Sequence, residues 1–159
     1  MATITHLPAG ATAADIIEVV ERDGAVIADD FVSPAWLAEF NAAIQTSVDS
    51  YEPYDYGEET AQEFLGYHTV RLNGLASKAP NYIDLILDER LLGVMDHFLA
   101  PNCGQYQLNS SEIIEIHGGE TAQELHTDDM IWPVNYWDPD KLLQFNVMIA
   151  DRKSTRLNS

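Results

Sequence analysis

Basic side chains are scarce in this chain. Its 159 residues include 8 Lys and Arg against 26 Asp and Glu, which gives a formal net charge of −18 at pH 7. Proteins that bind nucleic acid or anionic lipid do so mainly through Lys and Arg. We therefore expect no nucleic-acid partner and no membrane partner. The same deficit argues against a phosphate-rich substrate, and it is compatible with small polar or neutral metabolites and with lipophilic acids.

Cysteine and long apolar segments are also nearly absent. A single cysteine, Cys103, excludes an internal disulfide framework and fits a reducing compartment. We expect Cys103 to be a small buried residue beside a turn. Apolar runs are too short for a membrane helix, and residues 1–6 contain neither a basic segment nor an apolar signal core. These features predict a cytoplasmic protein of one domain, and they give no indication of its oligomeric state.

The first hundred residues have the signals of helices. Thr12 and Asp15 are spaced as a capping box before an apolar helix that Gly24 ends. A short apolar run at 25–28 suits a strand. Ser33 and Pro34 then begin a second helix, whose apolar residues recur at intervals of three and four: Leu37, Phe40, Ile44 and Val48. Further apolar spacing between residues 85 and 99 predicts one or two more helices.

Helical periodicity fails between Ser50 and Gly66, where tyrosines alternate with acidic residues. We interpret this segment as a loop. Long loops often carry function, so it is either a lid that selects substrate or a solvated surface loop.

From about residue 104 the pattern changes to strands. Residues 106–116 form one extended run, Gly118 and Gly119 make a turn, and residues 121–128 return as a second strand. Residues 143–149 alternate apolar and polar side chains with a period of two. Helices at about 12–100 followed by strands at about 104–150 predict an α+β fold.

His126 and Asp128 are the most informative residues. Side chains two positions apart on a strand project from the same face, so an imidazole and a carboxylate converge here. Such a pair begins the 2-His-1-carboxylate triad that holds Fe(II) in non-haem oxygenases. A second, distant histidine should complete the triad. Asp129 would point to the opposite face, which favours a structural role.

Several other pieces of sequence accompany this pair in a definite order. They are Glu18 to Val26, Gly74-Leu75, Pro80, Leu99 to Cys103, Tyr106 to Asn109, Glu112 to Ile116, Gln123 to Asp129 and Trp132-Pro133. In order and spacing they resemble the phytanoyl-CoA dioxygenase family of 2-oxoglutarate-dependent oxygenases, over residues 16–150. The family name need not describe the substrate of this protein.

The resemblance implies both a fold and a reaction. The fold would be a double-stranded β-helix, related to the jelly roll, with the amino-terminal helices packed on one sheet. His126, Asp128 and a second histidine would hold Fe(II), and 2-oxoglutarate and O2 would serve as cosubstrates. The reaction would be hydroxylation of a small organic substrate, because related halogenating enzymes lack the carboxylate that Asp128 supplies.

Five further residues are candidates for the pocket. The resemblance places Gln123 close to the cosubstrate, and Tyr106 and Asn109 lie in the predicted strand that precedes it. Trp132 could form an apolar wall of the substrate pocket, or it could belong to a packed turn. Arg71 could meet a substrate anion, or it could be an exposed surface cation.

The end of the chain differs in character from the rest. Residues 151–159 read Asp-Arg-Lys-Ser-Thr-Arg-Leu-Asn-Ser, which resembles the translation of a sequencing-library adapter, and we exclude them from fold reasoning. Residues 1–150 would then be a truncated oxygenase domain without the second histidine and the arginine that binds 2-oxoglutarate. The printed chain would be an inactive fragment of an active parent. The alternative is a non-catalytic jelly-roll binding domain that needs no metal.

Overall fold

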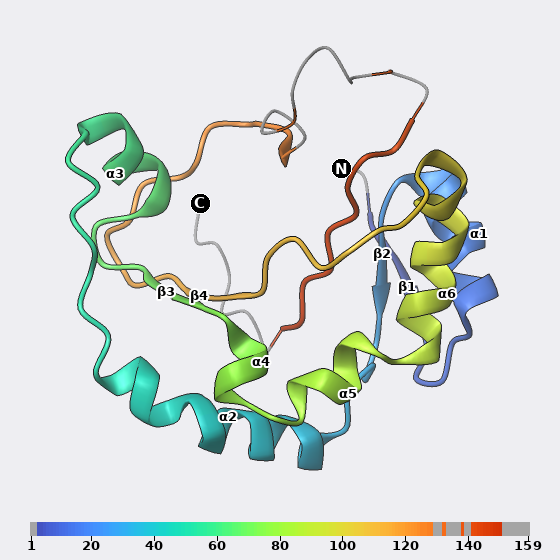
Figure 1. The fold of residues 1–159 in the computed structure, drawn as a ribbon, viewed down its shortest axis with the longest axis horizontal. Helices are drawn as coiled ribbons and strands as arrows, with labels where there is room; N and C mark the ends of the chain where they lie inside the picture. The colour runs from blue at the N-terminus through green and yellow to red at the C-terminus, as the bar shows by residue number, and fades with distance from the viewer. Residues whose placement is uncertain (1–2, 129–131, 133–137, 139–140, 151–159) are drawn as a thin grey trace. The chain divides into compact units, whose positions relative to one another are not determined.

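The computed structural model describes residues 3–128, 132, 138 and 141–150. They divide into two compact units (Figure 1). The first unit takes its described residues from Met1–Leu37, Asp88–Tyr106 and Asp129–Ser159, and the second comprises Ala38–Leu87 and Gln107–Asp128. Each unit therefore combines segments that are distant in sequence.

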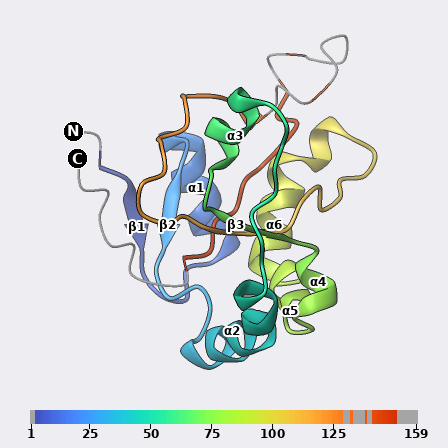
Figure 2. The same cartoon turned by 90° about the vertical axis from the view of Figure 1, so that its left-hand side faces the viewer.

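The first unit combines two helices with a parallel pair of strands. Strand β1 (Thr5–Leu7) pairs with β2 (Val26–Ala28), and the two lie side by side in Figure 2. Helix α1 (Ala13–Asp23) packs on α6 (Glu89–Phe98), which the short 3-10 helix η1 (Ala100–Asn102) follows.

Small residues allow close packing between α1 and α6. A Cβ added at Gly93 would lie 2.9 Å from the Cβ of Ala13, too near for an ordinary contact. The side chains buried at this interface are Ile16, Val19 and Val94. The apolar face predicted for the first helix is therefore its packing face.

Local signals at both ends of α1 are confirmed. The Thr12 hydroxyl accepts a hydrogen bond from Asp15 N at 3.2 Å, and the Asp15 carboxylate accepts one from Thr12 N at 2.8 Å. This reciprocal pair satisfies two backbone donors that the first turn of a helix otherwise leaves unpaired. Gly24 ends the helix with φ +78°, in the left-handed region that glycine adopts without strain.

An ion pair within the last turn of α1 is hydrogen-bonded to β1. Asp23 Oδ2 accepts from Arg22 Nη2 at 2.7 Å and from the Thr5 hydroxyl at 2.7 Å. The Arg22 guanidinium first, and then the Thr5 hydroxyl, lower the pKa of the Asp23 carboxyl from 3.8 to about 2. These contacts therefore favour the ionised form of Asp23 in the folded chain.

We expect this carboxylate to make stability depend on pH. A folded-state pKa below the unfolded one adds stability above pH 3.8, and that contribution is lost as pH falls toward about 2. The difference in unfolding free energy between wild type and Asp23→Asn should therefore shrink between these two pH values. Urea titrations followed by circular dichroism at a series of pH values measure it. Asp30→Asn, at an exposed position, is the control, and an equal pH dependence for both variants would contradict the prediction.

The second unit is built around an antiparallel strand pair. Strand β3 (Val70–Asn73) pairs with β4 (Glu112–Glu115), with Val70 opposite Glu115 and Asn73 opposite Glu112. Its helices are α3 (Glu59–Leu65), α4 (Leu75–Lys78), α5 (Tyr82–Ile86) and most of α2 (Pro34–Asp49). Its buried apolar residues are Phe40, Ile44, Val70, Leu72, Leu75, Ala79 and Leu85.

The predicted start of α2 is confirmed. Ser33 Oγ accepts a hydrogen bond from Trp36 N at 3.1 Å, directly before Pro34 in the first turn. Phe40 and Ile44 are buried, as their spacing indicates, and the Phe40 ring lies 6.2 Å from that of Tyr82 in α5.

The loop expected between Ser50 and Gly66 is wrong in part, because α3 occupies its second half. Its seven residues, Glu-Thr-Ala-Gln-Glu-Phe-Leu, are too few to show a helical period. Residues 51–58 have no helix or strand, as predicted. Strands β1 and β3 and helix α4 were not predicted, because each has only three or four residues and therefore shows little periodicity.

The α+β class is supported, but the extended strands are not. Within the described residues, β4 is the only strand after residue 104, and residues 106–111, 121–128 and 142–150 belong to no strand. The described residues form two small two-stranded sheets, whereas the resemblance implied a jelly-roll core. A segment with alternating side chains forms a strand only when a second segment pairs with its backbone N–H and C=O groups.

Cys103 is exposed, so the prediction of burial is wrong. Its Sγ lies 3.3 Å from the Leu99 carbonyl, directly after η1, and the turn that follows leaves it open to solvent.

Among the described residues, no helix has the length and apolar character needed to cross a bilayer.

Candidate functional site

The segment 120–128 carries the candidate metal ligands and belongs to the second unit. Residues 121–128 are exposed and have no strand pairing. The prediction of a strand here is wrong, so the two ligand candidates cannot owe their orientation to the alternation of a β-strand. Their positions depend instead on local turns and on side-chain contacts.

The structure nevertheless brings His126 and Asp128 together. His126 Nε2 lies 3.4 Å from Asp128 Oδ1. On the other side of the ring, Nδ1 lies 2.7 Å from the carbonyl oxygen of Glu124. A carbonyl only accepts hydrogen bonds, so Nδ1 must carry the proton of this contact. In the neutral imidazole this leaves the Nε2 lone pair directed toward the carboxylate.

This donor arrangement fits two positions of a metal site. Histidine ligands of metals commonly donate their other ring N–H to a carbonyl or carboxylate. Two neighbouring ligands in octahedral geometry, each at about 2.1 Å from the ion, are about 3 Å apart. The observed 3.4 Å between His126 Nε2 and Asp128 Oδ1 is close to that value. The part of the chain that the structure describes contains no group of three His, Cys, Asp or Glu that could hold a metal.

Helix α3 contacts the His126 ring and the residue Gln123 before it. The ring of Phe64 meets it edge to face, with centroids 4.7 Å apart. Gln123 Nε2 donates to the Phe64 carbonyl at 2.7 Å. The predicted role of Gln123 at the cosubstrate stays a prediction, but in this structure its amide is engaged with the end of a helix.

Tyr106 and Asn109 were expected in one strand, and this is wrong. Residues 105–111 form no strand, and the two side chains belong to different units. The Tyr106 hydroxyl donates to Asp96 Oδ1 at 2.7 Å. That hydrogen bond first, then burial and the charge of Asp96, raise the pKa of Tyr106. Asn109 is exposed. Their roles at the cosubstrate stay predictions.

Trp132 is half-buried, and its indole N–H donates to Gln144 Oε1 at 3.3 Å. Both residues belong to the first unit. Its role in a substrate pocket stays a prediction. Pro133 and Asp129 lie outside the described residues.

Arg71 is not an exposed surface cation, so that interpretation is wrong. Its side chain is 12% exposed, and its Nη1 lies 3.0 Å from Glu112 Oε2 on the paired strand β4. Its Nε donates to the Leu65 carbonyl at 2.8 Å. The guanidinium thus joins β3, β4 and the end of α3. Contact with a substrate anion stays a prediction, and any such anion would compete with Glu112.

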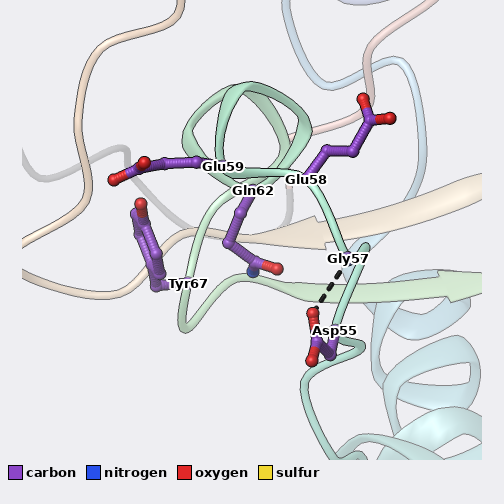
Figure 3. A pocket seen from close by; sticks show the side chains of 6 residues that line it. All are labelled: Asp55, Gly57, Glu58, Glu59, Gln62 and Tyr67. Carbon is purple, nitrogen blue, oxygen red and sulfur yellow. Dashed lines mark hydrogen bonds between the residues drawn. The ribbon is translucent and has the colours of Figure 1, made fainter.

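A shallow depression of about 330 Å³ lies beside the start of α3 (Figure 3). It is lined by Asp55, Gly57, Glu58, Glu59, Gln62 and Tyr67. Figure 3 shows Asp55 accepting from Gly57 N, at 2.8 Å, and the Glu59 side chain reaching toward Tyr67. The lining is acidic, so it suits neither 2-oxoglutarate nor another anion. The depression overlaps the segment predicted as a lid or surface loop.

Sequence reasoning missed two residues that support the His126 segment. Phe64 contacts the ring of His126, and the Glu120 carboxylate binds the turn that follows α3. In each of these contacts the two residues are more than 50 positions apart in sequence. No periodic pattern or motif in the chain signals such pairs.

Comparison with known proteins identifies relatives in the family that the sequence resembles. The family model described as phytanoyl-CoA dioxygenase matches residues 20–158. The match includes most of residues 151–159, and the proposed non-native origin of that tail stays a prediction.

Three curated relatives from fungi are named dioxygenases. Dioxygenase cdmA of Talaromyces verruculosus is 27% identical, over 92% of this chain and 52% of the relative. Dioxygenase swnH1 of Metarhizium robertsii is 30% identical, over 98% of this chain and 55% of the relative. Dioxygenase FrzG of a Cladobotryum species is 28% identical, over 81% of this chain and 45% of the relative.

This chain spans about half the length of the curated relatives it matches. The family match itself covers most of the chain, including the segment with His126 and Asp128 and all elements from the end of α1 onward. The chain therefore belongs to the phytanoyl-CoA dioxygenase family.

Proposed function

We propose that the intact parent protein is an Fe(II)- and 2-oxoglutarate-dependent dioxygenase that hydroxylates a small organic substrate. Membership of the family and the dioxygenase names of the relatives support an oxygenase. The observation that carries the finer assignment is the approach of His126 Nε2 to Asp128 Oδ1, at 3.4 Å, with Nδ1 engaged by a carbonyl.

In this proposal the chain's own residues bind and orient. His126 would coordinate through Nε2 while the Glu124 carbonyl holds its Nδ1 proton and the orientation of its ring. Asp128 would coordinate through a carboxylate oxygen and contribute negative charge. When bound, ferrous iron with 2-oxoglutarate and O2 supplies the oxidising power to convert an unactivated C–H bond to an alcohol.

The third ligand and the residue that binds the distal carboxylate of 2-oxoglutarate would come from outside residues 1–150. A site with only one nitrogen donor and one oxygen donor binds divalent metals weakly and with little selectivity. We therefore propose that the catalytic unit is the intact protein, and that residues 1–150 supply two of its three iron ligands.

Anaerobic titration of the intact parent with Fe(II) and 2-oxoglutarate tests this function. We expect a visible metal-to-ligand charge-transfer band that requires both components, and succinate formation once O2 and a substrate are admitted. Ca²⁺ in place of Fe(II) is the control, because it binds oxygen ligands but has no redox chemistry. An intact protein that gives no band and no succinate would instead support the non-catalytic binding domain.

A further inference from the structure

The turn after α3 gathers three hydrogen-bond donors at one point. Gly66 follows the helix with φ +94°, and a Cβ there would overlap the Thr69 hydroxyl and lie 3.0 Å from Glu120 Oε1. Only glycine fits this position without a shift of the turn. As a result, Tyr67 N, His68 N and the Thr69 hydroxyl all face one point. Successive backbone N–H groups arranged in this way favour an anion.

The carboxylate of Glu120 occupies that point. Its Oε2 accepts from Tyr67 N at 2.9 Å, and its Oε1 accepts from Thr69 Oγ1 at 3.0 Å and also from His68 N. Loss of hydration opposes ionisation, but the bonds from Tyr67, His68 and Thr69 outweigh it and lower the pKa of Glu120. Hydrogen bonds to a charged acceptor are stronger than those between neutral groups.

The residues that follow Glu120 continue the same attachment. The Thr121 hydroxyl donates to the Glu63 carbonyl at 3.2 Å, and Gln123 Nε2 donates to the Phe64 carbonyl at 2.7 Å. These carbonyls belong to the last turn of α3, where helices leave carbonyl oxygens without intrahelical partners. At the end of this row the His126 ring meets Phe64.

This row of contacts replaces the strand pairing that the segment lacks. Residues 121–128 are exposed and form no backbone ladder, so side-chain contacts determine where the segment lies. Glu120 makes three of those contacts, and it is the only charged member of the row. It does not touch His126 or Asp128 itself.

We propose that Glu120 is a positioning residue: its attachment to the turn after α3 places the segment 121–128 so that His126 lies against Phe64 and near Asp128. The consequence for iron rests on the function proposed above. The placement itself does not, because it concerns contacts within the chain.

Two-dimensional NMR of the chain tests the placement through nuclear Overhauser contacts between the ring protons of Phe64 and His126. We expect these contacts in wild type, their weakening in Glu120→Gln and their loss in Glu120→Ala. The amide of Gln retains one acceptor oxygen, but the NH2 group that replaces the other oxygen cannot accept a hydrogen bond from the turn. Gly66→Ala should produce the same loss with the Glu120 charge intact, because the added Cβ displaces the turn.

Glu52→Gln is the matched control, since it removes the same charge from an exposed loop position of the same unit. The Glu52 carboxylate makes no hydrogen bond or ion pair to the described residues. We expect its ring contacts to match wild type. Methyl signals of Ile16 and Val94 report whether the first unit stays folded. If Glu120→Ala unfolds the chain, Glu120→Gln and Gly66→Ala decide the question.

Ring contacts retained in both Glu120→Gln and Gly66→Ala would overturn the proposal, as would an equal loss of these contacts in Glu52→Gln. In the intact parent, Glu120→Ala should also weaken Fe(II) binding by about tenfold, the low end of what residues that orient a ligand contribute. Failure of the wild-type parent to bind Fe(II) would refute the proposed function, and the ring contacts would still test the role of Glu120.

Discussion

Replacing His126 with alanine in the intact parent is expected to abolish the charge-transfer band and to weaken Fe(II) binding by more than about 100-fold, because even residues that only orient a ligand contribute about 10- to 100-fold. The imidazole supplies the nitrogen donor that faces Asp128 at 3.4 Å. Without it, Asp128 is the only member of the proposed ligand pair that remains to hold the ion. Anaerobic Fe(II) titration and succinate formation measure the two effects.

His117→Ala is the matched control for His126→Ala. It removes a histidine of the same unit whose Nε2 lies 3.4 Å from Glu115 Oε1, with both side chains about half exposed. Exposed pairs of this kind contribute little to stability, so Fe(II) binding should be unchanged. Wild-type Fe(II) affinity in His126→Ala would remove this residue from the metal site and with it the proposed reaction.

Removing the charge of Arg71 should have the largest effect on stability. Its side chain is 12% exposed and that of Glu112 is 23% exposed, so the pair is more buried than a surface ion pair. Arg71→Met keeps most of the aliphatic volume but leaves Glu112 and the Leu65 carbonyl without this donor. We expect a loss of about 2–3 kcal/mol, between the values for surface pairs and fully buried pairs.

Urea titrations give the unfolding free energies for a double-mutant cycle. Arg71→Met combined with Glu112→Leu should be more stable than Arg71→Met alone, because the second change removes the carboxylate left without its partner. Lys78→Met is the control, since it removes a cation of the same unit that donates to the Asn73 carbonyl at 2.8 Å instead of to a carboxylate. If the double variant is no more stable than Arg71→Met, the ion pair between Glu112 and Arg71 contributes little to the free energy of unfolding.

Much of the helical structure could be predicted from short-range signals. The capping box at Thr12 and Asp15, the left-handed Gly24 and the Ser33-Pro34 start of α2 each act within four residues, and all three are present as predicted. Such signals work through hydrogen bonds and backbone angles of neighbouring residues. They need no information about the rest of the fold.

The strands could not be predicted in this way. Residues 143–149 alternate as a strand does, yet they form no strand, whereas the four-residue β3 pairs with β4 some forty positions later. Pairing depends on which distant segment supplies the complementary N–H and C=O groups. Arg71 illustrates the same limit. The sequence allowed an exposed surface cation, and the distant partner Glu112 makes Arg71 a largely buried one.

The order of residues alone determined that an imidazole and a carboxylate stand two positions apart at His126 and Asp128, and it carried the family resemblance. Tertiary structure decided how that segment is held: Glu120, Thr121 and Gln123 attach it to the end of α3, and Phe64 contacts His126. Neighbouring residues are close in any conformation of the chain. Contacts across more than 50 residues form only when the folded chain compensates the entropy of closing such a loop.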